Sequence, residues 1–377
     1  MRMIGKPAVT LSLMLAATLT GTALADEAKP AAPAAPALAD VLTASGITAT
    51  GYVDGTYSYL SVSPPTGSSQ DSNTFALNQA SLTLGYTPAA GFGVLVNAVA
   101  GTEASNGCYA PGYLPCSVTN PNTTSSFNLL QAYAQYISGK TTLYVGKFTT
   151  MAGAEVAAPT GNVNVTRSLL FWYSEPVTHV GARVSYAASA TTSFTVGLNN
   201  GWNVDTSTGS GKTLELAFGA TPFKALALTG AAYYGDVDRA NGLTSRALLD
   251  VVATWTVSPK LTIVGNVDWD NQKISPGTFL VAGDAKWWGA AVYGNFAIND
   301  TWRTSLRLEY LDDQDGFATT GSKQGSGIKV DEGTLTFGYA PSKNFEFRFE
   351  GRYDTAKFTG SPDAKSTQAW LQALYKF

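Results

Sequence analysis

Charged side chains alternate with apolar ones in several stretches of this 377-residue chain. In 344–354, "NFEFRFEGRYD", the phenylalanines occupy one set of alternate positions, and the other set includes Glu346, Arg348, Glu350 and Arg352. Successive side chains of a β-strand point to opposite faces, so these four side chains form one charged row. Charged side chains that line a water-filled passage select ions by their field, which is the chemistry we expect of this row.

Two further stretches repeat the alternation. Arg303 and Arg307 share one face of 300–311, and Asp268 lies on the polar face of 260–271. Burying so many charges in a dry core would cost several kcal/mol each unless all were paired, so we expect a water-filled lumen. For each residue, pairing with a neighbour in the wall is the alternative. The predicted pore-lining and constriction residues are Lys147, Glu155, Asn162, Asn164, Arg167, His179, Arg183, Asp268, Arg303, Arg307, Glu346, Arg348, Glu350 and Arg352.

Enzymatic chemistry has little support in this sequence. Serine hydrolysis needs a histidine base beside a serine, with a carboxylate that orients the base. The single histidine, His179, shares a face of 177–187 with Ser185, but no clear orienting carboxylate lies nearby in sequence. We therefore expect no enzyme and no cofactor.

The two cysteines, Cys108 and Cys116, lie within "GCYAPGYLPCS". An exported protein meets an oxidising compartment, and a short loop with proline and glycine can bring two thiols together. We predict a disulfide between them, with two free thiols as the alternative. A zinc site is disfavoured because His179 lies far along the chain, and we expect no metal.

The first 25 residues have the pattern of a secretory signal peptide. Arg2 and Lys6 precede an apolar run, and "ALA" at 23–25 fits a small-x-small cleavage site. Loss of two basic residues makes the mature chain more acidic than its formal net charge of −3, which argues against nucleic acid as a partner. Residues 26–45 are rich in alanine and proline and predict a periplasmic linker, extended or with a short helix at its end.

The composition favours membrane-spanning strands. Charged residues are 14% of the chain, whereas a soluble domain carries about 25%. After the signal peptide, no stretch offers the roughly 18 uninterrupted apolar residues of a membrane helix. Abundant glycine and tyrosine are typical of many strands and turns. These features predict an outer-membrane barrel, which we place at 46–377.

About sixteen segments of alternating polarity follow at regular spacing. Short connections such as "SGK" and "PSKN" follow even-numbered segments, and long polar connections follow odd-numbered ones. This sorting predicts an all-β, transmembrane, up-and-down antiparallel β-barrel with short periplasmic turns and long extracellular loops. A soluble sandwich has no reason to sort its connections in this way. The segments are 47–60, 74–87, 91–103, 127–138, 141–150, 177–187, 192–203, 212–221, 224–235, 244–257, 260–271, 285–298, 300–311, 329–340, 344–356 and 367–377.

The third long connection, 151–176, is the candidate constriction. It contains Glu155, Asn162, Asn164 and Arg167 beside the apolar run "LLFWY". An exposed loop has little use for such a run, whereas a loop folded against the inner wall can bury it. We predict that this loop folds into the lumen; an external cap or an oligomer latch is the alternative.

The last segment, "TQAWLQALYKF", alternates and closes on Phe377. This ending resembles the C-terminal signature that outer-membrane barrels present to their assembly machinery. We therefore expect the barrel-assembly machinery and outer-membrane lipid as partners. Porins with this number of strands commonly assemble as trimers, but the lipid-facing pattern does not distinguish a subunit contact from a lipid contact.

Several short motifs together resemble the OmpL-like family of β-barrel porins, beta-barrel porin family 2. They are "GYVDGTYSY" (51–59), "LLQAYAQY" (129–136), "GKF" (146–148), Glu155, "NVNVTRSLLF" (162–171), "EPVTHVGARVSY" (175–186) and "NNGW" (199–202). The resemblance covers 46–377, although its motifs lie mainly between 46 and 222. Family members usually have an acidic residue after Asn-Gly-Trp, where this chain has Asn203. The resemblance implies channel activity and says little about the solute.

The leading hypothesis is a porin in a bacterial outer membrane whose water-filled channel passes ions and small hydrophilic solutes by passive diffusion. The first alternative is a channel selective for sugars or small organic acids, because Trp287, Tyr293 and Trp370 fall on the polar alternates of their strands. A surface receptor or adhesin that uses the long loops is the second.

Overall fold

The computed structural model describes residues 38–63, 70–104, 127–206, 211–236, 243–275, 283–321, 323 and 326–377. The predicted signal peptide, residues 26–37 of the predicted linker and both cysteines lie outside this part of the chain. The end of the linker forms a helix, α1 (Leu38–Ser45). None of the helices among the described residues is long and apolar enough to cross a membrane.

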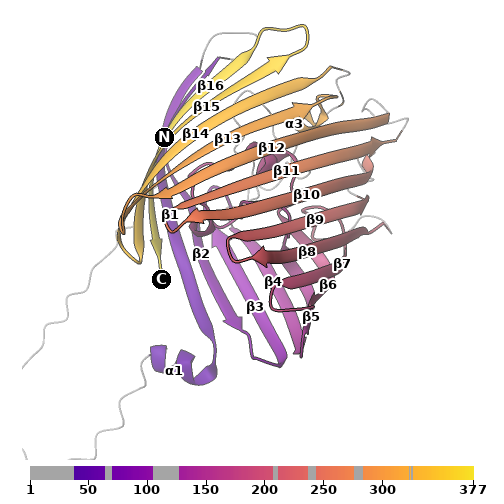
Figure 1. Ribbon diagram of the computed structural model, residues 1–377, viewed down its shortest axis with the longest axis vertical. Helices are drawn as coiled ribbons and strands as arrows, with labels where there is room; N and C mark the ends of the chain where they lie inside the picture. The colour runs from indigo at the N-terminus through magenta and orange to yellow at the C-terminus, as the bar shows by residue number, and fades with distance from the viewer. Residues whose placement is uncertain are drawn as a thin grey trace, which may run out of the picture. The chain divides into compact units, whose positions relative to one another are not determined.

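The chain from β1 onward forms a closed antiparallel barrel of sixteen strands (Figure 1). Each strand pairs with its neighbours in sequence, and β16 closes the barrel by pairing with β1. The strands are β1 (Thr48–Ser63), β2 (Gln70–Tyr86), β3 (Gly91–Ala100), β4 (Phe127–Ser138), β5 (Thr141–Thr149), β6 (Thr178–Ala187), β7 (Thr192–Asn199), β8 (Thr213–Phe223), β9 (Leu226–Asp236), β10 (Leu243–Ser258), β11 (Leu261–Ile274), β12 (Gly283–Ala297), β13 (Trp302–Asp313), β14 (Ile328–Ser342), β15 (Phe345–Phe358) and β16 (Ala364–Lys376). The predicted fold and strand number are confirmed.

Burial in the barrel is inverted relative to a soluble protein. On β15, Phe347 and Phe349 are exposed on the outer face, whereas Arg348 and Glu350 between them are buried. Other strands show the same outward apolar face, and the exposed side chains include Leu306, Leu308 and Leu335. An apolar outer surface around a polar interior is the pattern of a barrel in lipid.

Short turns join the strands at one end of the barrel. The turn between β4 and β5 contains only Gly139 and Lys140, and Gly139 has φ +58°, which a glycine adopts without steric strain. Backbone hydrogen bonds in both directions between Gly51 and Phe377 extend the β1–β16 pairing to the last residue. Closure leaves no unpaired edge strand, as a lipid environment requires.

Longer connections join the strands at the other end. The β13–β14 connection contains the short helix α3 (Phe317–Thr320). The connection from β5 to β6 is residues 150–177 and contains a 3-10 turn, η1 (Pro159–Gly161), and the helix α2 (Leu169–Tyr173). We call residues 150–177 the inner loop, because its contacts are with inward-facing side chains of the barrel.

Candidate functional site: the inner loop and the lumen

The helix α2 begins with a local capping interaction. The hydroxyl of Ser168 accepts a hydrogen bond from the backbone N–H of Phe171, 2.9 Å, which satisfies one donor at the helix N-terminus. The run "LLFWY" follows this cap and supplies the apolar face of the helix. A five-residue helix is marginal alone, so packing must hold it in place.

Apolar contacts bury α2 against the inner faces of β12 and β13. Leu169 and Tyr173 belong to a buried cluster that includes Trp287 and Leu311. Leu170, which is fully buried, packs in a second cluster with Tyr293. The inner loop therefore lies inside the barrel, as the sequence predicts for 151–176.

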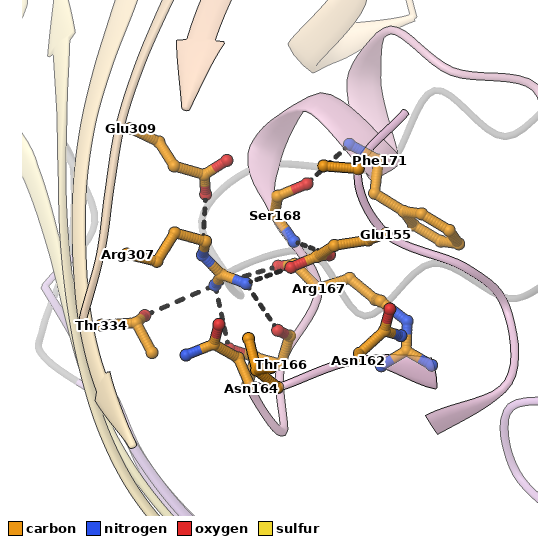
Figure 2. Close-up of polar contacts among 12 residues, drawn as sticks. Glu155, Asn162, Asn164, Thr166, Arg167, Ser168, Phe171, Arg307, Glu309 and Thr334 are labelled. Carbon is orange, nitrogen blue, oxygen red and sulfur yellow. Dashed lines mark hydrogen bonds and ion pairs between the residues drawn. The ribbon is translucent and has the colours of Figure 1, made fainter. Parts of the chain in front are cut away.

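Arg307 on β13 is the centre of the polar contacts between wall and loop (Figure 2). Its guanidinium lies 2.8 Å from the Glu155 carboxylate of the loop, 3.3 Å from Glu309 and 3.2 Å from Glu332. It also donates to the backbone oxygen of Thr166, 2.7 Å. Because Arg307 is fully buried, these partners replace the water that the charge has lost.

Two wall carboxylates accept hydrogen bonds from loop backbone amides. Glu350 on β15 accepts from the N–H groups of Val165 and Thr166, at 2.6 and 2.9 Å, and from the Thr166 hydroxyl at 2.6 Å. Glu309 on β13 accepts from the N–H of Leu169, at 2.9 and 3.0 Å to its two oxygens. Hydrogen bonds to charged groups are stronger than neutral ones, so these contacts fix the loop backbone firmly.

Three arginines of the barrel wall donate hydrogen bonds to carbonyl oxygens of the inner loop. Arg303 donates to Val163 (2.8 Å) and Arg352 to Arg167 (2.7 Å). Arg348 donates to the oxygens of Pro159 and Asn164, at 3.2 and 3.3 Å. Arg303 and Arg348 share one carboxylate partner, Glu346, and Arg352 pairs with Asp354.

Contacts within the inner loop shape the turn that precedes α2. Asn162 accepts from the N–H of Val156 and donates to its C=O. Arg167 donates to the carbonyls of Val156, Ala157 and Val165. Asn164 reaches the wall, where its amide donates to the Thr336 hydroxyl, 2.7 Å.

Ten of the predicted site residues therefore lie together at the interface of the inner loop with the wall. They are Glu155, Asn162, Asn164, Arg167, Arg303, Arg307, Glu346, Arg348, Glu350 and Arg352. Most are buried, because the loop covers the wall side chains. Their predicted contribution to the pore lining stays a prediction.

Two of the remaining predicted residues, Lys147 and Arg183, make ion pairs elsewhere. Lys147 lies 2.8 Å from Asp205, whose side chain is exposed. Arg183 lies 3.2 Å from Glu215 and over the ring of Phe148, with 3.6 Å from its guanidinium carbon to the ring centroid.

His179 is fully buried and stacks on Tyr233, and its Nδ1 lies 2.9 Å from the Gly201 carbonyl oxygen. Ser185, its hypothetical nucleophilic partner, hydrogen-bonds Thr195 instead. Asp268, the last of the predicted residues, lies in an acidic cluster with Asp250.

A cavity of about 500 Å³ lies on the opposite side of the lumen, between the inner loop and β1–β5. The loop contributes 156–158 and Thr160, and the wall contributes mainly uncharged polar side chains such as Tyr52, Thr83, Asn97 and Gln131. Lys376 is the one charged side chain among the described residues that line it. The cavity also reaches Asn344 in the β14–β15 turn and Phe377 at the end of the barrel wall.

Sequence reasoning left Glu309, Glu332 and Asp354 out of the predicted site residues, although each contacts the Arg307–Arg352 network. All three lie on the polar alternates of their strands, and this alternation places Glu309 and Asp354 toward the lumen. It does not show which lumen-facing charges the loop contacts. Thr166 and Glu175 had no such signal, because loop residues have no periodicity.

Burial raises the pKa of two ionisable groups at the end of the inner loop. The pKa of the Tyr173 hydroxyl is raised by burial. The pKa of the Glu175 carboxyl is raised well above its ordinary value by burial, and the neighbouring charge of Asp250 raises it further. Negative charge at Glu175 is therefore costly without a compensating partner.

A closed barrel with an apolar outer face, a polar interior and a loop held inside its lumen defines a channel of the porin class. The chain belongs to the family described as "Putative beta-barrel porin-2, OmpL-like", whose model matches residues 46–377. The protein is thus a porin of the bacterial outer membrane, and its family and fold indicate a channel. Comparison with curated protein sequences gave no match.

Solved structures share the fold at low sequence identity. The outer membrane channel DcaP of Acinetobacter baumannii is 14% identical, with a TM-score of 0.62, over 88% of this chain and 97% of its own. OmpT, an outer membrane protein of Vibrio cholerae, is 11% identical with a TM-score of 0.60, over 88% and 97%. An anion-selective porin from Comamonas acidovorans is 11% identical with a TM-score of 0.58, over 88% and 99%.

Proposed function

We propose that ions and small hydrophilic solutes cross this porin by passive diffusion, between the loop residues 156–160 and the inner faces of β1–β5. The observation that supports this path is the cavity of about 500 Å³ at that place. The opposite side of the lumen is filled by α2 and by the charged contacts between the loop and β13–β15. A solute on the proposed path meets hydroxyl and amide groups together with apolar side chains such as Leu130 and Val156.

Passive diffusion is favoured over a channel selective for sugars or small organic acids. The selective hypothesis depends on aromatic side chains that are free to stack on a solute. Trp287 and Tyr293 are nearly fully buried, and both belong to the clusters that pack α2. Of the three aromatic side chains behind this hypothesis, Trp370 alone is partly exposed. Liposome swelling with sugars of equal size tests this point, because diffusion predicts equal rates.

A matched pair of substitutions tests the permeation path. Thr83 lines the cavity, and its neighbour Leu84 is exposed on the outer face. Thr83→Trp is expected to lower single-channel conductance in planar bilayers, because the indole occupies part of the passage. Leu84→Trp adds the same ring toward lipid and is expected to leave conductance unchanged. Equal conductance in both variants would place the path elsewhere.

Three further proposals concern maturation and assembly. We propose that residues 1–25 are removed on export and that residues 26–45 remain as a periplasmic linker. Mass spectrometry of the mature chain tests the cleavage.

A structure of OmpT of Vibrio cholerae is described as a trimer form, which supports a homotrimer here. Light scattering in micelles tests the number of subunits. The exposed ring of Phe377 supports recognition by the barrel-assembly machinery, and Phe377→Ser is then expected to reduce the folded barrel in outer membranes.

A further inference from the structure

Three buried carboxylates meet where the inner loop ends. Glu175 belongs to the loop, Asp250 to β10 and Asp268 to β11, and one oxygen of each lies within 4.8 Å of the others. Asp250 and Asp268 are directly opposite each other in the β10–β11 register. Like charges in opposite positions of a sheet repel, so this arrangement needs a bound cation or a proton that compensates for the negative charge.

Four carboxylate oxygens of this cluster accept no hydrogen bond of good geometry from the described residues. Both carboxylate oxygens of Glu175 are buried and unpaired, and so are Oδ1 of Asp250 and Oδ2 of Asp268. Glu175 is 7% exposed, and the two aspartates are fully buried. Buried polar atoms are almost always partnered, so four unpaired oxygens at one point indicate a missing ligand.

The neighbouring groups orient the carboxylates but do not neutralise them. The Asn266 amide donates to Oδ2 of Asp250 (2.7 Å) and to Oδ1 of Asp268 (3.2 Å), which leaves their other oxygens free. The nearby cation, Arg246, pairs with Asp270 instead, 3.3 Å. In the part of the chain that the structure describes, no ion pair involves any of the three clustered carboxylates.

The loop backbone is shaped to pass close to this cluster. Gly153 has φ +91°, and a Cβ at this position would collide with the carboxylate of Glu175. One residue later, the N–H of Ala154 donates to Oδ1 of Asn266, 2.8 Å. Both ends of the inner loop thus converge on β10 and β11 at the acidic cluster.

We propose that Glu175, Asp250 and Asp268 bind one divalent cation, with calcium as the best-matched ion. Calcium takes oxygen ligands at about 2.3–2.6 Å, so two ligands of one ion are at most about 5 Å apart, which the cluster satisfies. The donors are all carboxylate oxygens, which suits a hard cation rather than zinc or copper. The bound ion ties the loop to β10–β11, whereas Arg307 and Glu350 tie it to β13–β15.

The competing explanation is a proton shared between the two aspartates, whose carboxyl groups approach each other closely enough for a hydrogen bond. A shared proton compensates one charge and leaves both oxygens of Glu175 unpaired. It also predicts no specific calcium binding. The two explanations therefore differ in whether the protein binds calcium specifically, which can be measured directly.

The test is calcium titration of the mature protein in detergent micelles free of lipopolysaccharide, after treatment with EDTA and its removal. Isothermal titration calorimetry is expected to find one site per chain that prefers calcium over magnesium. Glu175→Gln and Asp268→Asn are each expected to weaken binding roughly tenfold or more, since each removes a ligand charge. The matched control is Asp331→Asn, which neutralises an exposed carboxylate on β14 that pairs with Lys357 and does not belong to the cluster. This variant should bind calcium like the wild type.

Thermal unfolding gives a second readout that does not depend on calorimetry. Calcium is expected to raise the Tm of the wild type and of Asp331→Asn, but not that of Glu175→Gln. Because Glu175 lies in the loop, its substitution leaves the strands intact and keeps the test valid if Asp268→Asn fails to fold. Equal calcium binding by the wild type and Glu175→Gln would overturn the proposal, because calcium would then bind at another place. No calcium binding by the wild type would overturn it in favour of the shared proton.

Discussion

Two sides of one lumen use polar side chains in different ways. The inner faces of β13–β15 carry charged groups such as Arg307 and Glu350, which are buried because they hold the inner loop. The inner faces of β1–β5 carry mainly hydroxyl and amide groups such as Thr83 and Gln131, which face a cavity. A charged row on the wall of a barrel can therefore anchor a loop, while mainly uncharged side chains line the cavity on the other side of that loop.

The energetics explain this division. A buried ion pair is useful only when hydrogen bonds satisfy its remaining atoms, and a loop backbone offers many N–H and C=O groups at short range. Glu350 receives two backbone N–H groups, and Arg348 donates to two carbonyl oxygens. The charged side of the lumen is therefore a matching surface for one particular backbone path.

The largest expected effect comes from removing the centre of the charged side. Arg307→Met leaves Glu155, Glu309 and Glu332 buried without their shared cation, and breaking a buried pair in this way costs about 3–5 kcal/mol. The free energy of unfolding in micelles, measured with urea, is expected to fall by that amount.

The control for this substitution is Lys147→Met, which removes a cation from an ion pair with an exposed partner. The carboxylate of Asp205 is 69% exposed, so water replaces the lost partner and the change should stay below about 1 kcal/mol. An equal decrease in the free energy of unfolding in both variants would show that the buried ion pairs of Arg307 stabilise the barrel no more than the exposed pair of Lys147.

A smaller effect is expected from Glu350→Gln. The amide keeps one accepting oxygen, but an NH2 donor replaces the other. The charge that attracts the N–H groups of Val165 and Thr166 is lost as well, at about 1.5–3 kcal/mol. Hydrogen exchange of these two amides, measured by mass spectrometry, is expected to accelerate while exchange in the β1–β2 strands is unchanged. Unaltered exchange at Val165 and Thr166 would show that other contacts hold the loop.

The smallest effect on stability, and the sharpest on permeation, is expected from a charge added on the cavity side. Thr160→Glu places a carboxylate in the loop segment that lines the cavity and should shift the reversal potential in a salt gradient toward cations. Thr191→Glu, in an exposed hairpin turn, adds the same charge away from the cavity and should leave the reversal potential unchanged. A shift of equal size in both would remove the cavity from the permeation path.

Much of the architecture was predictable because its determinants are local. The alternation of Phe347 and Phe349 with Arg348 and Glu350 identifies a strand with an apolar and a charged face, whatever lies beside it. The run "LLFWY" in a long connection predicted a loop that must bury itself. The strand ends were less accurate, since β16 begins at Ala364 rather than at residue 367, because "AKS" there has no strong alternation.

The sequence by itself determined the sixteen-strand barrel, its short and long connections and the inward folding of one loop, because side-chain period and turn residues act over a few positions. Only the tertiary structure decided which charges are covered and which groups line the open cavity. Arg307 and Glu155 are 152 positions apart, and Asp250 and Glu175 belong to different elements. Such partners depend on the path of the loop across the lumen, which no local pattern encodes.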